Sequence, residues 1–255
     1  MPAILALIGC GLLAGVLGGY LGVGGGIVIV PFLTLVMGLD IKAAVPVSVA
    51  AIVINSLASS SEYLRNGMVN LELVVVLTIS MVVGTIIGSM LLTVVASTYI
   101  KLIFAAILVY TAITFLRGKE STGLAPSIDH NGGRMRLCGF LSFCGGILAG
   151  LVGIGGGVIV IPLMFLVLGV PLGIARGTSS FIVGFAGAAS VSIYFTSGLV
   201  DLSVAPAVMF GTVLGGKVGG SLGAVAKPRV VKILFFVLLL YTAVRLAFGA
   251  IGDLR

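Results

Sequence analysis

The sequence has very few charged residues. Only 8% of its 255 residues are Asp, Glu, Lys or Arg, while 60% are hydrophobic. A chain of this composition cannot cover a soluble domain with a polar surface, which excludes the soluble globular classes. The alternation of polar and apolar residues that marks a membrane β-barrel is also missing. The expected fold class is therefore all-α, a polytopic bundle of membrane helices.

The residue types that build most catalytic and metal sites are scarce. The single histidine, His130, lies in a charged segment. Three cysteines, Cys10, Cys138 and Cys144, are spread through apolar sequence without metal-ligand spacing. A buried hydrolase would need a serine beside a histidine, or a metal cluster. We therefore expect no enzyme, no metal and no cofactor, and cysteines that pack as small apolar residues.

Acidic residues are missing from the interiors of the apolar segments. Asp40, Glu62, Glu72 and Asp201 all stand near segment ends. A proton or sodium relay across a membrane ordinarily uses a buried carboxylate, so the pattern argues against such a relay. The net charge of +7 comes from basic residues in short loops. They indicate lipid headgroup contacts and membrane topology, and no nucleic acid partner is expected.

Glycine, by contrast, is abundant, and its densest run occurs twice. The stretch GVGGGIVIVPFL from Gly22 aligns with GIGGGVIVIPLM from Gly153, and the register continues without a gap to Ala112 and Ala243. The chain is therefore an internal duplication. Matched identical pairs include Ser48 with Ser179, Tyr63 with Tyr194, Gly67 with Gly198, Gly84 with Gly215 and Gly88 with Gly219.

The duplication divides the chain into three parts. We expect a first transmembrane repeat at 1–117, a cytoplasmic linker at 118–136 and a second transmembrane repeat at 137–255, because the charged, Gly- and Ser-containing stretch between the copies resembles a solvated linker. Each repeat contains five apolar segments. The expected bounds are 4–20, 26–38, 43–60, 71–96 and 100–116 in the first, and 137–151, 157–170, 175–196, 202–225 and 230–248 in the second.

An odd number of segments per repeat predicts that the two repeats are inverted in the membrane. The basic linker should be cytoplasmic, and counting outward then places the loop at Arg65 inside and the matching loop near Gly198 outside, as the distribution of Lys and Arg favours. Eight full crossings in two parallel halves fit the composition almost as well, so the number of segments and their orientation stay open.

The two glycine runs predict broken or re-entrant helices. A helix from Gly26 to Gly38 is only about 20 Å long, against a hydrocarbon core of about 30 Å. We expect half-helices before and after each run, or one helix broken there. The first N–H groups after each break, at 26–29 and 157–160, would lack partners and attract an anion. The alternative, close helix packing, is favoured for the scattered glycines Gly84, Gly88, Gly215, Gly219, Gly220 and Gly223.

Polar residues near these breaks complete the candidate site. Hydroxyls early in the third segment of each repeat are expected either to cap the helix or to bind an anion. Arg176 is either a counter-charge for the substrate or a headgroup anchor, and the role of Lys217 is equally open. The candidate substrate-binding residues are Gly24, Gly25, Gly26, Ile27, Ser48, Asn55, Gly155, Gly156, Gly157, Val158, Arg176, Thr178, Ser179 and Ser180.

The duplicated pattern of GxGGG, an apolar run with proline, and a serine-containing helix resembles the TauE/SafE family of membrane proteins, named for sulfite export. The resemblance covers nearly the whole chain. It implies a multi-pass transporter in the bacterial cytoplasmic (inner) membrane that exports small sulfur-containing anions such as sulfite, thiosulfate or organosulfonates, by alternating access. An importer of a sulfur compound on the same scaffold and an anion channel are the alternatives.

Membrane physics agrees with anion export. An inside-negative potential of 100 mV favours the exit of each negative charge by about 2.3 kcal/mol, so export needs no coupling ion. The sequence does not identify the anion, the direction of transport or any ion coupling. Base rates for oligomers favour a homodimer, with the lipid bilayer as the other partner.

Overall fold

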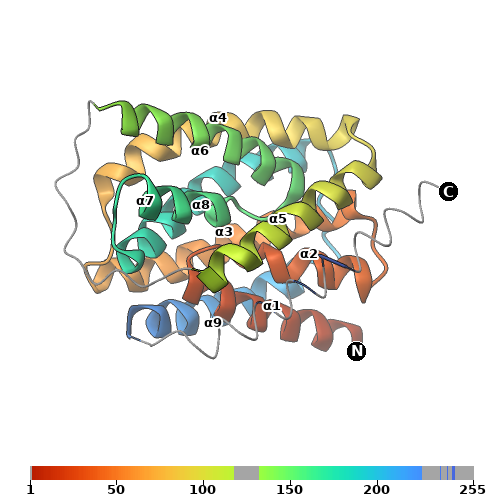
Figure 1. Ribbon diagram of the computed structural model, residues 1–255. Coiled ribbons are helices and arrows are strands. Elements are labelled where there is room, and N and C mark those ends of the chain that lie inside the picture. The colour runs from red at the N-terminus through yellow and green to blue at the C-terminus, as the bar shows by residue number, and fades with distance from the viewer. Residues whose placement is uncertain (1, 118–131, 226–235, 237–239, 241–242, 245–255) are drawn as a thin grey trace.

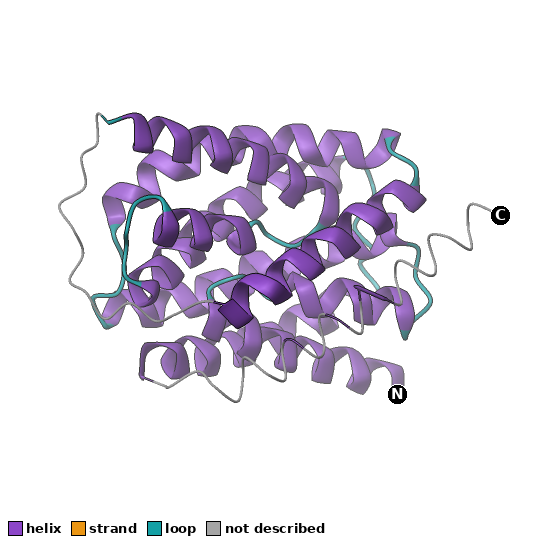
Figure 2. Cartoon of the chain, in the orientation of Figure 1, coloured by secondary structure: helices purple, strands orange, loops and turns teal. Residues whose placement is uncertain are grey.

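The computed structural model describes residues 2–117 and 132–225, together with positions 236, 240, 243 and 244. Within these residues all regular structure is helical, which confirms the all-α fold class (Figure 2). The helices are α1 (Pro2–Leu21), α2 (Gly26–Leu35), α3 (Ile41–Arg65), α4 (Leu71–Val94), α5 (Ser97–Arg117), α6 (Gly133–Val152), α7 (Gly157–Leu166), α8 (Leu172–Thr196) and α9 (Ala205–Val225). The fifth apolar segment expected in the second repeat, 230–248, lies almost entirely outside the described residues, as does most of the linker.

Five of the described helices, α1, α3, α4, α6 and α8, are long and apolar enough to cross a membrane. The helices α2 and α7 contain 10 residues each. At 1.5 Å per residue each is about 15 Å long, half the thickness of the hydrocarbon core. The short helices predicted after the glycine runs are therefore present, and neither can cross alone.

The half-helix predicted before each glycine run is wrong. Both α1 and α6 contain 20 residues, which is about 30 Å of helix. After α1 the chain turns back: the N–H of Val23 bonds to the carbonyl oxygen of Gly18 at 3.0 Å, and Gly25 lies against Ala14. Because Ala14 is two turns before the end of α1, α2 begins near mid-height and runs back along α1.

The matched helices α3 and α8 cross at the centre of the bundle in opposite directions. Tyr63, near the end of α3, packs against Gly177 near the start of α8, while Val53 in the middle of α3 packs against Gly187 further along α8. Antiparallel packing of matched helices is what an inverted repeat requires. The inversion relative to the membrane stays a prediction.

The outer helices are exchanged between the two halves. Helix α1 packs along α9, and α4 packs along α6, so the first helix of each half lies against the fourth helix of the other. Figure 1 shows α4 and α6 together along the top of the bundle, α1 and α9 along the bottom, and α3 and α8 between them. The two repeats therefore share one core.

Glycines make the exchanged contacts close. A Cβ on Gly84 of α4 would stand 2.1 Å from the carbonyl oxygen of Phe143 in α6, and one on Gly215 of α9 would stand 2.2 Å from that of Leu12 in α1. Two helix backbones can approach this closely because the glycine places no side chain between them. The packing interpretation is confirmed for all six scattered glycines, Gly84, Gly88, Gly215, Gly219, Gly220 and Gly223.

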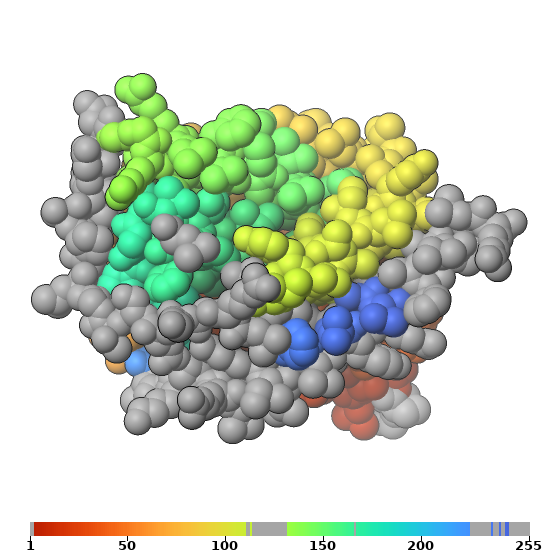
Figure 3. Space-filling view, viewed as in Figure 1, coloured from red at the N-terminus to blue at the C-terminus, as the bar shows by residue number. Residues whose placement is uncertain are grey.

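The outward faces of these helices are apolar. Figure 3 shows α5 lying across one face of the molecule beside the helices of the second half. Large exposed hydrophobic side chains occur on several helices, among them Val75 and Ile79 on α4, Phe140 on α6 and Phe210 on α9. Exposed apolar side chains of this kind suit contact with lipid tails.

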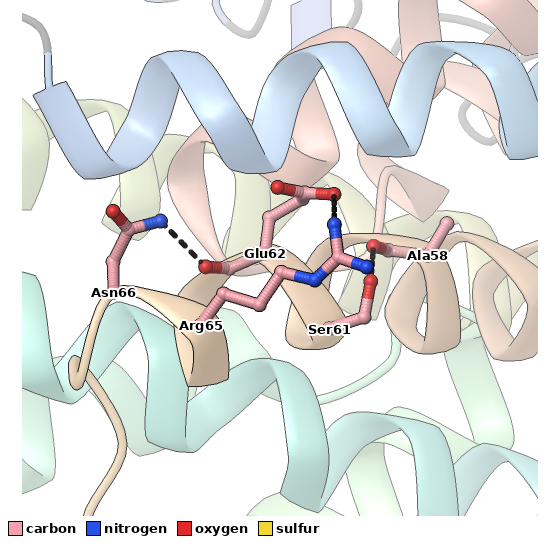
Figure 4. A network of polar contacts seen from close by, with 5 residues as sticks. All are labelled: Ala58, Ser61, Glu62, Arg65 and Asn66. Carbon is pink, nitrogen blue, oxygen red and sulfur yellow. Dashed lines mark hydrogen bonds and ion pairs between the residues drawn. The ribbon is translucent and has the colours of Figure 1, made fainter.

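The acidic residues lie at helix ends, as expected. The Asp40 side chain caps α3 by accepting a hydrogen bond from the Lys42 N–H at 2.8 Å. Asp201 precedes α9, where the Ser203 hydroxyl and N–H bond its carboxylate and lower its pKa. Glu62 pairs with Arg65 at 3.6 Å in the last turn of α3, where Asn66 also bonds the Glu62 carbonyl oxygen (Figure 4).

Candidate functional site

The two glycine runs meet at the centre of the molecule. Gly24 and Gly155 lie against the same two side chains, Ile52 of α3 and Val183 of α8. A Cβ on Gly26 would stand 2.4 Å from the carbonyl oxygen of Gly153 in the other run. We call residues 22–27 and 153–158 the paired break, and every one of these residues is buried.

Glycine is required in the paired break by backbone geometry. In the first run Gly22, Gly24 and Gly25 have φ angles of 72°, 83° and 91°, and the matching glycines of the second run have φ angles of 74° to 78°. Residues that carry a Cβ rarely adopt φ angles in this left-handed region. It lets the chain reverse after α1 and α6 while leaving no Cβ between the two runs.

The paired break carries free backbone donors. The N-cap residues of α2 and α7, Gly25 and Gly156, provide no side-chain cap. Within the described part of the chain, four N–H groups that follow them form no hydrogen bond: those of Gly26, Ile27, Gly157 and Val158. The next two N–H groups of each helix bond to the N-cap carbonyl oxygen, so the four free donors predicted per helix are reduced to two.

Free N–H donors are the groups that hydrogen-bond an anion. A buried N–H without a partner costs about 1–3 kcal/mol, which a bound acceptor would recover. Both helix N-termini also carry partial positive charge. The residues around them are apolar, with Ile27 and Val158 each 1% exposed. An anion at this place would meet donors from both halves of the chain in a low-dielectric surrounding.

Two serines hold the runs from opposite halves. The Ser48 hydroxyl donates to the carbonyl oxygen of Gly153 at 3.0 Å, and the Ser179 hydroxyl donates to that of Gly22 at 2.8 Å. Both side chains are completely buried. Each serine therefore positions the opposite run. Neither caps its own helix, which was one of the two alternatives, because the N-cap residues of α3 and α8 are Asp40 and Pro171.

Among the described residues, Asn55 forms a hydrogen bond with the first glycine run and not with the second. Its side-chain N–H donates to the Gly24 carbonyl oxygen at 2.9 Å. Its Oδ1 is buried and has no partner within the described residues, and it lies beside Gly216, where a Cβ would approach it to 2.3 Å. The matching position in the second half is Ala186, so this contact breaks the symmetry of the site.

Two of the predicted residues form no described hydrogen bond with the break. The Thr178 hydroxyl accepts a hydrogen bond from the Asn70 N–H at 3.0 Å, which ties α8 to the loop before α4. The Ser180 hydroxyl is buried and has no partner among the described residues. Neither contacts the glycine runs in any described hydrogen bond.

Tyr63 and Tyr194 contact the ends of the helices that lead into the break, and the sequence did not indicate them as site residues. The Tyr63 hydroxyl donates to the carbonyl oxygens of Gly19 and Tyr20 at 3.0 and 2.9 Å, and the Tyr194 hydroxyl donates to that of Gly150. Each tyrosine thus satisfies the last turn of the helix that leads into a break. Their identity in the aligned repeats was the available signal.

Arg176 lies at the first run, without an equivalent at the second. Its guanidinium stands 5.6 Å from the centre of the Tyr20 ring and donates to the Tyr20 carbonyl oxygen at 3.4 Å. The matching residue, Val45, is completely buried beside Gly153. Lys217, by contrast, lies on an exposed face of α9, away from the break. No group of three potential metal ligands occurs among the described residues.

Comparison with known proteins finds similarity to membrane transporters over nearly the whole chain. The sequence model of the sulfite exporter TauE/SafE family matches residues 7–246. A probable membrane transporter protein of Bacillus subtilis, YunE, is 25% identical over 98% of this chain and 99% of its own length. One from Xylella fastidiosa is 27% identical over 90% of this chain and 87% of its own. No solved structure matches.

Proposed function

Because the chain belongs to the sulfite exporter TauE/SafE family of membrane transporters, we propose that it exports a small sulfur-containing anion, and that the anion binds at the paired break. The observation that carries the proposal is the set of four buried, unpartnered N–H groups at Gly26, Ile27, Gly157 and Val158. An oxyanion such as sulfite, thiosulfate or a sulfonate offers several acceptor oxygens to such donors.

The surroundings of the break favour an anion over a cation. The carbonyl oxygens of Gly22, Gly24 and Gly153, which would otherwise attract a cation, accept hydrogen bonds from Ser179, Asn55 and Ser48. No carboxylate lies among the buried polar residues of the described chain. These three carbonyl oxygens are therefore partnered, whereas the four N–H donors of the break are free within the described chain.

The opposed geometry of the two runs supports alternating access. The first run leaves α1 beside Arg176 near the start of α8, and the second leaves α6 beside Val45 near the start of α3. Since α3 and α8 are antiparallel, the two runs approach the centre from opposite ends of the bundle. Movement of one exchanged set of helices against the other would open the central donors to one end at a time.

The membrane potential favours export of an anion across the cytoplasmic membrane. An inside-negative potential drives anions outward without a coupling ion, whereas uptake of the same anion would need one.

The purified protein is reconstituted in liposomes loaded with sulfite, thiosulfate, sulfate or sulfoacetate, and efflux is measured with and without an imposed potential. We expect saturable efflux of at least one sulfur anion, accelerated by an inside-negative potential.

Two variants test the site. Gly155→Ala places a methyl group about 3 Å from both Ile52 and Val183, a contact that small side-chain movements relieve. Gly67→Ala introduces similar backbone strain at φ 65° in a loop with open space. We expect Gly155→Ala to lower efflux roughly tenfold and Gly67→Ala to leave it nearly unchanged. Equal efflux in the two variants would remove the paired break as the site.

The same assay separates the alternatives. An importer would accumulate the anion only when an ion gradient is imposed, and it would show little efflux under the potential alone. A channel would show flux that does not saturate and no counterflow. Either result would replace the export proposal.

A further inference from the structure

The two ends of the paired break have different chemistry. One end holds Arg176, Tyr20 and Tyr63 around Gly22, and we call these four residues the Arg176 mouth. At the matching positions of the other end stand Val45, Leu151 and Tyr194 around Gly153, so the cation and one tyrosine are replaced by aliphatic side chains. An exact repeat would have produced equal ends, so the difference calls for a physical explanation.

The Arg176 guanidinium is only weakly held. Its two hydrogen bonds, from Nε to the Leu172 carbonyl oxygen and from Nη1 to the Tyr20 carbonyl oxygen, are both 3.4 Å long. An arginine has five N–H donors, so most of them have no acceptor within the described part of the chain. The side chain is neither fully buried nor fully exposed. It can therefore exchange a weak carbonyl contact for a charged acceptor.

No carboxylate neutralises Arg176 in the described part of the chain. The acidic residue at this end of α3, Glu62, pairs with Arg65 on the side facing α9 (Figure 4). The mouth also holds a buried polar atom that has no partner among the described residues, the Tyr20 hydroxyl, and the whole residue is 3% exposed. A free cation and an unpartnered hydroxyl at one place are the complement of an oxyanion.

We propose that the Arg176 mouth is an oxyanion-binding subsite at one end of the paired break, which delivers the ligand to the central N–H groups. The inference rests on the proposed function, because it assigns the chemical class of ligand and the end from which it arrives. Arg176 stands one helical turn before Ser179, which holds the same glycine run, so the subsite and the break are about 5 Å apart along α8.

A planar guanidinium selects among anions. It pairs with two oxygens of one sulfonate, sulfite or thiosulfate group at once, which a halide cannot reproduce. The subsite therefore prefers oxyanions to chloride. Arg65 at this end favours the cytoplasmic side, and with that orientation the subsite receives anions that are to leave the cell.

A subsite at one end changes the kinetics of transport, but it leaves the equilibrium distribution of the anion across the membrane unchanged. In passive transport the ratio of concentrations at equilibrium depends on the potential alone, so Arg176 cannot drive net flux. It lowers the concentration needed for half-saturation at its own face. The opposite face, where Val45 takes its place, needs a higher concentration.

Binding is measured first, on the full-length detergent-solubilised protein, as the shift in melting temperature with methanesulfonate or chloride at constant ionic strength. Arg176→Gln is compared with Arg176→Lys and with Arg65→Gln, a control at the same end whose partner is Glu62. We expect Arg176→Gln to raise the half-saturating methanesulfonate concentration about tenfold or more. Arg176→Lys should raise it less, and Arg65→Gln should change it less than about twofold.

Flux is measured second, with methanesulfonate supplied at one face of oriented proteoliposomes. The half-saturating concentration should rise in Arg176→Gln only at the face that carries Arg65. An equal rise at both faces, or an unchanged value at both, overturns the subsite. So does an equal effect of Arg65→Gln on binding, which would indicate general surface charge.

The two proposals fail in different ways. If the wild-type protein binds methanesulfonate through Arg176 but transports no sulfur anion, the export function is wrong and the subsite stands. If the wild-type protein transports the anion and Arg176→Gln does so with unchanged half-saturation, the subsite is wrong and the export function stands. A role of Arg176 confined to stabilising the end of α1 would lower the melting temperature without changing half-saturation, which also overturns the subsite.

Discussion

The Ser179 hydroxyl donates a hydrogen bond of 2.8 Å to the carbonyl oxygen of Gly22, 157 residues away in the sequence. The matched serine of the first half, Ser48, bonds Gly153 of the second in the same way. Each half of the chain therefore holds the glycine run of the other. The paired break is a product of both halves, and changes in one half should be felt in the other.

Removing the serine contacts should destabilise the protein. In Ser179→Ala the buried Gly22 carbonyl oxygen loses its partner, and we expect a loss of about 1–3 kcal/mol in the free energy of unfolding. The measurement is denaturant or thermal unfolding in detergent. Ser192→Ala is the control, because that serine is exposed on the same helix and bonds only its own helix. Equal stability of the two variants would contradict a clamping role for Ser179.

Asn55→Asp should disrupt the first run. The amide donor to the Gly24 carbonyl oxygen becomes a carboxylate, which is either charged in an apolar surrounding or protonated at a price in free energy. We expect at least about 2 kcal/mol of destabilisation. Asn66→Asp, at the exposed end of the same helix, provides the comparison. A similar small effect of both substitutions would show that the Asn55 contact contributes little.

Gly84→Val should separate α4 from α6. The new Cβ would stand 2.1 Å from the Phe143 carbonyl oxygen, so one helix must move. Overpacking of this kind costs about 1–3 kcal/mol, and here the obstacle is backbone. Gly9→Val on α1 meets no atom within 4 Å and is the control. The melting temperature should fall in the first variant and change little in the second.

The inversion of the two repeats is tested by the matched loop residues Asn66 and Ser197. Asn66→Cys and Ser197→Cys are made separately after the three native cysteines are replaced, and each is exposed to a thiol reagent that does not cross membranes. We expect Asn66→Cys to react from the cytoplasmic side and Ser197→Cys from the outer side. Labelling of both from one side would show that the halves are parallel.

Local features of the structure were predictable from the sequence. The short helix after each glycine run, the placement of acids at helix ends and the packing role of Gly84 and Gly88 all follow from length, composition and spacing. The half-helix before each run was wrong because hydropathy does not show where the chain reverses. The positive φ angles of Gly22 and Gly153 allow that reversal, and many glycines in the sequence have no such role.

Contacts between the halves were not predictable. Ser48 and Ser179 were expected to cap helices or bind an anion, and Thr178 was expected at the substrate. In the structure the two serines donate hydrogen bonds to the opposite glycine runs, and the Thr178 hydroxyl accepts one from Asn70. A hydroxyl bonds whichever acceptor lies within about 3 Å, and which acceptor that is depends on how distant helices cross.

Composition and self-alignment are enough to predict that the protein is helical, lies in a membrane and consists of two copies of one unit. Three further features depend on how distant helices pack: the copies exchange their outer helices, their glycine runs meet, and one end of the meeting point carries Arg176 while the other carries Val45. The same packing leaves the central N–H groups free. A buried N–H stays unpaired only when no neighbouring segment supplies an acceptor, and this depends on the positions of all the surrounding helices.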